Sequence, residues 1–205
     1  MNLLQRLVPT IEDLVSSNNL TMQDIDGVIA SLGPGSFTGL RIGVTCAKTI
    51  AWSLNIPIVG IPTLDAIAQA CIHYKYDFTA AMVFSRANEV YWSVFDSISK
   101  KDVIETQATS LESAIETLKN LKGTVICCGS GAVRNRSKLE SIDEKIKVAP
   151  DWESFARGYI LLKLGIEKLS DNKVDDSLAL TPVYVRKPTP VVRKEAAKEN
   201  YSANG

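Results

Sequence analysis

The chain has 205 residues, of which 45% are hydrophobic and 22% are charged, and its 23 basic residues balance its 23 acidic ones. A chain of this length can bury a core in one large domain or two small lobes, and its composition argues against extensive disorder. The balance of charges excludes the strongly basic surface with which a protein holds nucleic acid without help.

The first sixty residues predict a helix, a β-strand, a second helix and a second strand. Apolar residues recur every three or four positions over residues 2–17, which is typical of an amphipathic helix, with a kink or a new start at Pro9. A short apolar run at 27–32 predicts a buried strand. A glycine-containing loop then leads to a helix that begins at residue 38 or 39 and ends at 54, followed by a strand at 56–61. This order indicates a βαβ unit and therefore an α/β lobe.

The rest of the chain predicts a mixture of helices and short strands. Two β-rich stretches, 79–85 and 89–97, flank a tight turn at Ala87–Asn88 and predict a hairpin. The other predicted elements are a helix at 63–74 capped by Thr63, a helix at 110–121, a strand at 124–128, a helix at 151–169, a late strand at 183–186 and a solvated tail from 188.

The histidine and cysteine content limits the chemistry that the chain can perform. The only histidine is His73, and a zinc site needs three or four ligands at suitable spacing, so we expect neither a metal site nor a cofactor. A Ser-His-Asp arrangement would have to use His73, which we interpret instead as a surface or half-buried histidine. The four cysteines form no C-x-x-C pair, no apolar run is long enough to cross a membrane, and no signal peptide is visible. We therefore expect a cytoplasmic protein.

The loop after the first predicted strand is the most informative segment for binding. A glycine-rich loop before a helix directs backbone N–H groups and a positive helix end at one point, as in anion sites. The loop does not match G-x-x-x-x-G-K-[ST], because Leu40 and Arg41 replace the lysine and the hydroxyl, nor G-x-G-x-x-G, because Thr38 replaces the third glycine. Phosphate binding and a tight turn of small residues both remain open. The candidate residues are Gly33, Gly35, Ser36, Phe37, Thr38, Gly39 and Arg41.

A stripe of small residues marks the helix that follows this loop. Its members recur every four positions and so share one helix face. Glycine in a helix costs about 1 kcal/mol relative to alanine, so its presence indicates that another backbone, of this chain or of a partner, comes close. Helix 2–17 is the expected second contributor to a protein–protein interface. The candidate interface residues are Leu3, Leu4, Leu7, Ile11 and Leu14 on one helix and Gly39, Gly43, Ala47 and Ala51 on the other.

Two smaller features have structural interpretations. Gly129-Ser130-Gly131 follows a predicted strand and precedes a helix, and we interpret it as a turn rather than as a phosphate site. Arg86 and Glu89 flank the predicted hairpin turn, where an exposed ion pair is the simplest expectation.

Three segments between residues 33 and 68 together resemble a known family. GPGSFTGLRIG, CAKTIAW and IPIVGIPTLDAIA are closely similar to the TsaB family, which was formerly grouped with glycoprotease-like proteins. The family also has a hairpin with Asp-Ala-Arg-x-x-Glu-Val-Tyr, and Phe84 and Ser85 here replace its first two residues. Further positions that resemble the family are Arg86, Glu89, Val90 and Tyr91 in the hairpin, and Pro182, Tyr184 and Arg186 near the C-terminus.

The resemblance implies an α/β, actin-like (RNase H-type) fold of two lobes. It also implies a non-catalytic scaffold in the complex that forms N6-threonylcarbamoyladenosine at position 37 of tRNA, with a TsaD-type paralogue and a TsaE-type ATPase as partners. In the family, the helices that correspond to 2–17 and 39–54 meet TsaD or a second copy, so a homodimer through the N-terminal helices is expected, with tRNA contacted only indirectly. A glycoprotease-like hydrolase and a nucleotide-binding enzyme of the same fold class are the alternatives.

The sequence departs from the family at its start. Family members open with a strand of the pattern Ile-Leu-Ala-Ile-Asp-Thr-Ser and a hairpin, whereas this sequence begins with helix 2–17. We therefore expect a truncated N-terminal lobe at 1–62, a second α/β lobe at 63–187 and a flexible tail at 188–205. Strand 27–32 is then expected to present an unpaired edge. Aggregation, a strand borrowed from a partner and a true start upstream are the possible outcomes, of which we prefer the last.

Overall fold

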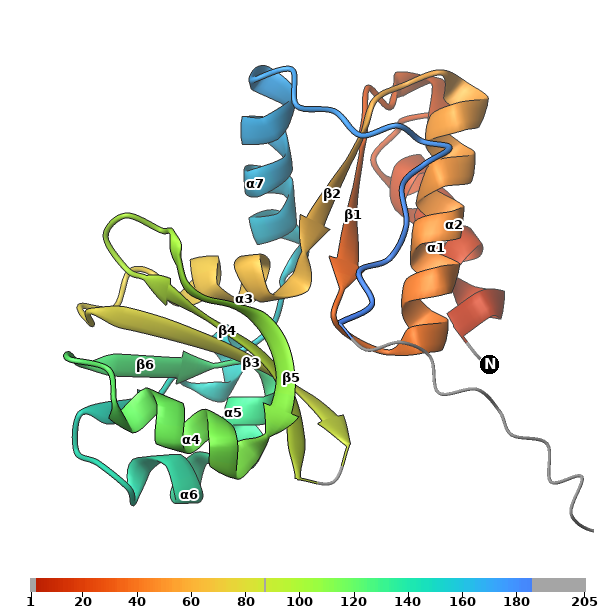
Figure 1. Ribbon diagram of the computed structural model, residues 1–205. Helices are drawn as coiled ribbons and strands as arrows, with labels where there is room; N and C mark the ends of the chain where they lie inside the picture. The colour runs from red at the N-terminus through yellow and green to blue at the C-terminus, as the bar shows by residue number, and fades with distance from the viewer. Residues whose placement is uncertain (1–2, 87, 186–205) are drawn as a thin grey trace, which may run out of the picture.

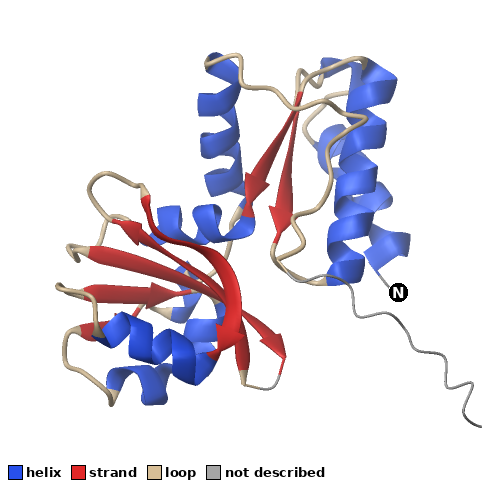
Figure 2. Ribbon diagram, in the orientation of Figure 1, coloured by secondary structure: helices blue, strands red, loops and turns tan. Residues whose placement is uncertain are grey.

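Two β-sheets, each flanked by helices, form two lobes in the computed structural model, which describes residues 3–86 and 88–185 and the side chains from residue 5 onward (Figures 1 and 2). In chain order the elements are α1 (Leu3–Ser17), the 3-10 helix η1 (Met22–Asp24), β1 (Val28–Gly33), α2 (Phe37–Leu54), β2 (Ile58–Pro62), α3 (Thr63–Cys71), β3 (Phe78–Arg86), β4 (Glu89–Asp96), β5 (Asp102–Ser110), α4 (Leu111–Lys119), β6 (Val125–Cys128), α5 (Ser130–Arg134), α6 (Arg136–Glu140), β7 (Ile146–Val148), the 3-10 helix η2 (Asp151–Glu153) and α7 (Gly158–Ser170).

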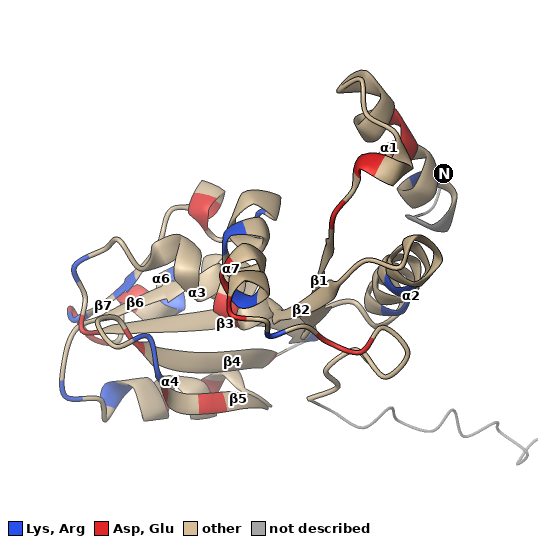
Figure 3. Ribbon diagram, turned by 90° about the horizontal axis from the view of Figure 1, so that it is seen from above, with Lys and Arg blue, Asp and Glu red and all other residues tan. Residues whose placement is uncertain are grey.

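The first lobe is built on the parallel pair β1 and β2, which confirms the predicted βαβ unit. Helix α2 packs on one face of this pair and α7 lies on the other, while α1 packs against α2 (Figures 1 and 3). Val44 and Ala51 of α2 are buried against Ala30 and Ile58 of the strands. On the opposite face Gly165 of α7 lies so close to β1 that a methyl group at residue 165 would overlap the side chain of the facing isoleucine.

After α7 the chain runs back over the first lobe. Asp175 forms an antiparallel bridge with Ile58, and its backbone N–H donates to the carbonyl oxygen of that residue at 2.9 Å. Lys48 Nζ of α2 donates to the carbonyl oxygens of Leu178 at 2.9 Å and Leu180 at 2.8 Å. The Leu180 side chain is buried in the core between α2 and the strands. This segment is therefore an integral part of the first lobe.

These contacts correct one part of the expected division into lobes. We assigned all of residues 63–187 to the second lobe, but α7 and the segment at 175–183 pack on β1, β2 and α2. The physical reason is that both faces of the short β1–β2 sheet must be buried against apolar side chains. Helix α2 covers one face, and α7, which follows the second lobe in the chain, covers the other. The expected tail, 188–205, lies outside the described residues.

The second lobe contains a five-stranded sheet with the order β5-β4-β3-β6-β7. Strand β3 is antiparallel to β4 and parallel to β6, so the predicted hairpin is confirmed. Helices α4, α5 and α6 supply the core on one face, and α3 supplies it on the other. Trp92 of β4 is buried in the first of these cores, where its indole N–H donates to Thr109 Oγ1 at 2.9 Å. This satisfied polar group allows a large aromatic side chain to be buried without an orphaned donor.

Several elements differ from their predicted form. The helix expected at 151–169 is divided into η2 and α7, because Arg157 is extended and serves as the N-cap of α7. The helix expected at 63–74 ends at Cys71, and α1 continues through Pro9 as one helix. The segment expected as a strand at 183–186 makes one backbone hydrogen bond, from Val183 N–H to the Leu32 carbonyl at 2.8 Å, and Arg186 lies outside the described residues.

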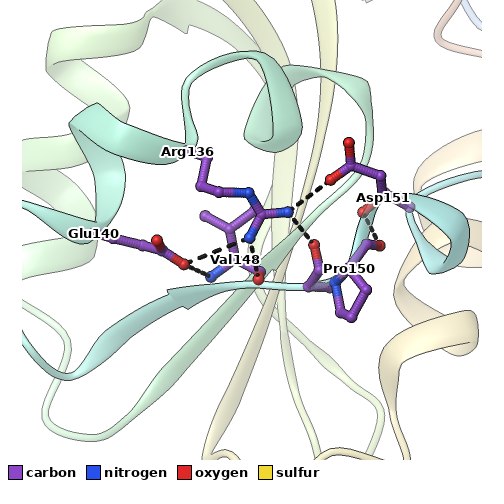
Figure 4. A network of polar contacts seen from close by, with 7 residues as sticks. Arg136, Glu140, Val148, Pro150 and Asp151 are labelled. Carbon is purple, nitrogen blue, oxygen red and sulfur yellow. Dashed lines mark hydrogen bonds and ion pairs between the residues drawn. The ribbon is translucent and has the colours of Figure 1, made fainter.

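A network around Arg136 holds the connection between β7 and α7 (Figure 4). Its guanidinium donates to the carbonyl oxygens of Val148 and Ala149 and to Asp151 Oδ1, each at 2.8 Å. Glu140 lies 3.6 Å from the same guanidinium and accepts the N–H of Val148 at 3.1 Å. Arg136 thus provides donors for the carbonyl groups at the end of the short strand β7. These bonds hold the segment through which the chain returns to the first lobe.

Charged residues of both signs are interspersed over the two lobes (Figure 3). The expected ion pair across the hairpin turn is present, with Arg86 Nε 3.1 Å from Glu89 Oε2. Within residues 3–86 and 88–185, no helix is both long and apolar enough to span a bilayer.

Candidate functional site

The glycine-rich loop turns the chain from β1 into α2. Gly33 has a φ of +106°, a conformation that favours glycine, and a methyl group there would lie 2.8 Å from Leu40 Cδ1. Ser36 is the N-cap of α2, and its Oγ accepts the N–H of Gly39 at 3.3 Å. The serine side chain therefore provides an acceptor for one of the backbone N–H groups that have no partner in the first turn of α2.

The C-terminal segment packs on this loop. The rings of Phe37 and Tyr184 lie 5.4 Å apart, and the Arg41 guanidinium lies 3.9 Å from the centre of the Phe37 ring. Arg41 Nε also donates to the Tyr184 hydroxyl at 3.1 Å. The cavity left between loop and segment has a volume of about 60 Å³, which is too small for a nucleotide. The cavity residues are Pro34, Gly35, Phe37, Leu40, Tyr91, Val183, Tyr184 and Val185.

The loop therefore has a structural use for most of its predicted residues. Gly33, Ser36, Phe37 and Arg41 make the turn, the helix cap and the contact with the C-terminal segment, and the hydroxyl-bearing Thr38 is exposed in the first turn of α2. Phosphate binding at this helix end stays a prediction.

A larger apolar groove lies between α1 and α2. Its volume is about 350 Å³, and it contains Leu7 and Ile11, two of the residues predicted for a partner interface. Leu14, one turn further along α1, is exposed, whereas the side chains of Leu3 and Leu4 lie outside the described residues. A concave surface lined mainly by apolar side chains can accept the side chains of another chain. The groove residues are Leu7, Val8, Ile11, Glu12, Met22, Ile42, Thr45, Cys46, Thr49 and Ile50.

The small-residue stripe of α2 does not line this groove as a unit. Ala47 and Ala51 are only 7% and 1% exposed and face their own sheet, so they are not accessible to a partner. A methyl group at Gly43 would meet no atom within 4 Å, whereas we expected a close backbone there. Gly39 is half-buried and donates to the N-cap serine. The stripe prediction is corrected: its two alanines fit the core, and Gly43 faces open space.

Sequence reasoning missed the residues that α2 contributes to the groove. Ile42, Cys46 and Ile50 recur every four positions, about a quarter turn away from the small residues. This apolar spacing is visible in the sequence, but the helical glycines indicated the neighbouring face as the contact surface. Partial burial raises the pKa of the Cys46 thiol, which favours its protonated, weakly nucleophilic form. The groove is therefore suited to apolar contact rather than to thiol chemistry.

The surroundings of His73 do not form a nucleophile–base pair. His73 is exposed at the end of α3, and its Nε2 lies 3.7 Å from Glu153 Oε2. The same carboxylate accepts the hydroxyl of Tyr74 at 2.5 Å, and this hydrogen bond raises the pKa of Tyr74 to about 12. Cys71 is buried, and its thiol points to the carbonyl of Glu153. Across residues 3–86 and 88–185, no hydrogen bond joins His73 to a hydroxyl or a thiol, and no group of His, Cys, Asp and Glu could hold a metal ion.

The second glycine turn has a packing role. Gly129 has a φ of +94°, and a methyl group there would overlap the carbonyl oxygen of Met82. At Gly131 the same carbonyl group would lie at 3.1 Å. The two glycines thus let α5 approach β3 closely, which agrees with the interpretation as a turn.

Comparison with protein families gives one match over most of the chain. Residues 2–151 match the family described as TsaD, tRNA N6-adenosine threonylcarbamoyltransferase. Among curated proteins, the chain is 31% identical over 185 residues to the tRNA threonylcarbamoyladenosine biosynthesis protein TsaB of Bacillus subtilis, with 88% of this chain and 78% of the relative covered. It is 27% identical to the protein of the same description from Haemophilus influenzae, with 89% and 79% covered.

Solved structures with the same fold come from Pseudomonas aeruginosa. A protein described as uncharacterized, with similarity to peptidase YeaZ, superimposes with a TM-score of 0.69 at 20% identity and covers 89% of this chain and 83% of its own. YeaZ itself superimposes with a TM-score of 0.66 at 20% identity and covers 88% and 83%. These similarities confirm the predicted two-lobed, actin-like α/β fold.

Proposed function

The chain belongs to the TsaD and TsaB family of tRNA threonylcarbamoyladenosine biosynthesis, and from this premise we propose that it is an accessory scaffold subunit for forming N6-threonylcarbamoyladenosine at position 37 of tRNA. Its partners would be a TsaD-type paralogue, which transfers the threonylcarbamoyl group, and a TsaE-type ATPase, all in the cytoplasm. The chain itself would supply no catalytic group, cofactor or metal, and would contact tRNA only through its partners.

The apolar groove between α1 and α2 is the observation that carries this proposal. Val8, an apolar residue on the rim of this groove, is 48% exposed. Leu7 and Ile11 line the groove as half-buried side chains. Such a groove accepts a helix of another chain whose apolar side chains fill it, so a TsaD-type paralogue or a second copy would dock here.

The net charge of zero supports an indirect role in tRNA recognition. Each phosphate contact is made by a lysine or arginine that releases counterions, and a protein with balanced, interspersed charges has little of this driving force. A partner with a basic surface would hold the tRNA.

Reconstitution tests the proposal. The chain, a TsaD-type protein and a TsaE-type protein from the same genome are combined with tRNA, ATP and a threonylcarbamoyl donor, and the modified nucleoside is quantified by mass spectrometry. We expect modification only when all three proteins are present, and an unchanged rate with His73→Ala. Hydrolysis of peptides or transfer to tRNA by the isolated chain, lost in His73→Ala, would contradict the accessory role.

A further inference from the structure

A small pocket lies in the second lobe, where the end of β3 meets α5. Its volume is about 100 Å³. Pockets that hold a whole cofactor or a drug-sized ligand have about 300–1,000 Å³, so this one suits a single small chemical group. Val90 and Leu111 are both buried and supply its apolar lining. The other lining residues are Phe84, Asn88, Glu89, Arg134 and Asn135.

The Arg134 guanidinium lies over the ring of Phe84, with its central carbon 4.2 Å from the ring centre. The backbone N–H of Phe84 donates to Ser130 Oγ at 3.1 Å, which joins β3 to the beginning of α5. Because Gly129 and Gly131 let α5 approach β3 closely, the fold brings the arginine onto the ring. An aromatic ring attracts a cation, but it supplies no oxygen acceptor for the five N–H donors of a guanidinium.

The charge of Arg134 is not balanced within the described part of the chain, where no carboxylate forms an ion pair with it. The carboxylate on the pocket lining, Glu89, already accepts from Arg86 Nε at 3.1 Å. Glu112, which is hydrogen-bonded to a lining asparagine, is paired with Lys138. One positive charge therefore remains available at the pocket.

The sequence gives a reason for this unbalanced charge. The hairpin motif of the family has aspartate at the position of Phe84 in this chain. An aspartate side chain reaches about as far as the centre of a phenylalanine ring, so its carboxylate would lie beside the Arg134 guanidinium and pair with it. With phenylalanine at this position, the carboxylate has to come from another molecule.

We propose that the pocket binds the carboxylate group of a short aliphatic acid. A guanidinium offers a carboxylate two parallel N–H donors, and its single charge matches a carboxylate better than a phosphate dianion. Asn88 and Asn135 each use one amide N–H within the chain and retain a second one on the pocket lining. Val90 and Leu111 contact the methylene groups of the acid. The site goes beyond the proposed function, because it takes no part in docking at the α1–α2 groove.

Proton–nitrogen NMR of the isotope-labelled chain tests the site. The probes, added at equal ionic strength, are sodium propionate, sodium phosphate and the blocked peptide acetyl-Gly-Glu-Gly-amide. We expect propionate to shift the Nε–H signal of Arg134 and the side-chain amide signals of Asn88 and Asn135, with half-saturation in the millimolar range. Phosphate should shift them much less. An equal response to the peptide would identify a glutamate side chain as the source of the carboxylate, and a response to propionate alone would identify a free acid.

Arg134→Gln, at an exposed position, should abolish the shifts at both asparagines while the unfolding midpoint stays unchanged. The matched control is Arg6→Gln, which removes an exposed arginine of α1 that likewise has no ion-pair partner among the described residues, and it should bind propionate as the wild type does. Phe84→Asp supplies an internal carboxylate and should abolish binding as well. If Phe84→Asp does not fold, Arg134→Gln decides alone.

The proposal would be overturned by the absence of any response to propionate, by tighter binding of phosphate, or by a wild-type response in Arg134→Gln. A folded Phe84→Asp variant that responds like the wild type would overturn it too. None of these results concerns the α1–α2 groove, so the proposed function would stand in each case.

Discussion

The two sheets of this protein close their edges in different ways. In the larger sheet, one edge strand, β7, is only three residues long, and the other, β5, carries Asp102, Glu105 and Gln107 with most of its residues exposed or half-buried. Short and polar edges of this kind resist pairing with other chains. In the small sheet, the outer edge of β2 is capped by Asp175 and Lys168, whereas among the described residues β1 pairs with β2 alone.

The two lobes also differ in how completely they bury their apolar side chains. The second lobe completes its own core on both faces of its sheet, with Leu64 on one side and Trp92 on the other both fully buried. The first lobe has a small core and presents apolar surface on α1, α2 and α7. We therefore propose that the partner interface lies on the first lobe.

The largest expected effect lies in the core of the second lobe. Trp92→Ala removes a buried aromatic side chain and leaves Thr109 Oγ1 without its indole donor, so the free energy of unfolding should fall by about 3–5 kcal/mol. Trp52→Ala, at a 67% exposed position on the first lobe, is the control and should change it by less than about 0.5 kcal/mol. Urea denaturation followed by circular dichroism measures both. Equal effects would remove the distinction between a well-packed and an open lobe.

The junction between the lobes should make stability depend on pH. Burial, with a smaller contribution from Asp102, raises the pKa of Asp65 to about 6, although Lys168 opposes the shift. A raised pKa in the folded state means that stability is fully present below the unfolded pKa of about 3.8 and is lost as the pH rises through 6. The loss should be on the order of 2–3 kcal/mol.

Asp65→Asn provides the test of this pH dependence. Unfolding free energies measured at several values between pH 4 and pH 7 should fall with pH in the wild type and remain flatter in the variant. The same slope in both proteins would show that the burial of Asp65 has no energetic consequence.

A smaller effect is expected where α7 is docked on β1. Gly165→Ala introduces a methyl group that overlaps Ile29 Cδ1, and this overpacking should cost about 1–3 kcal/mol, less the gain of about 1 kcal/mol from replacing a helical glycine. Gly158→Ala, on the same helix with no atom within 4 Å, is the matched control and should not destabilise the protein. In an Ile29→Ala background, which lacks Cδ1, Cγ1 and Cγ2, Gly165→Ala should no longer destabilise the protein. Without such a rescue the close contact would not be the cause.

Substitutions at two small residues of α2 are expected to have different effects, one on partner binding and the other on stability. Gly43→Leu projects into open space, so the protein should gain up to about 1 kcal/mol in stability while partner affinity falls. Ala47→Leu should instead lower stability by about 1–3 kcal/mol, because residue 47 is buried against the sheet. Thermal unfolding and a pull-down with the TsaD-type protein report the two effects. If Gly43→Leu bound as tightly as the wild type, the groove would not extend to this position.

The sequence predicted the elements whose apolar spacing is regular and failed where the structure depends on distant contacts. The βαβ unit and the hairpin have clear patterns, and they are confirmed. Strand β5 was not predicted because its few apolar residues give no alternation, and it exists through pairing with β4. The return of 175–183 to the first lobe depends on Lys48 and Leu180, which are 132 positions apart, and no local signal reveals it.

The candidate site was predicted only in part for a similar reason. Leu7 and Ile11 follow from the amphipathic pattern of α1. Periodicity alone, however, does not say which face of α2 meets the sheet, because Gly43, Ala47 and the groove residue Cys46 lie on adjoining faces. The contacts of Val44, Ala47 and Ala51 with β1 and β2 determine which face of α2 is turned toward the sheet.

The most direct test of the account is the affinity of the chain for its TsaD-type paralogue, measured by isothermal titration calorimetry. Val8→Glu places a charge on the rim of the α1–α2 groove and should weaken binding at least tenfold, since a desolvated, unpaired carboxylate is costly. Ile98→Glu, an equally drastic change at a 91% exposed position of the second lobe, should leave the affinity unchanged. If Val8→Glu bound normally or Ile98→Glu did not, the first lobe would not be the docking lobe, and the account would be contradicted.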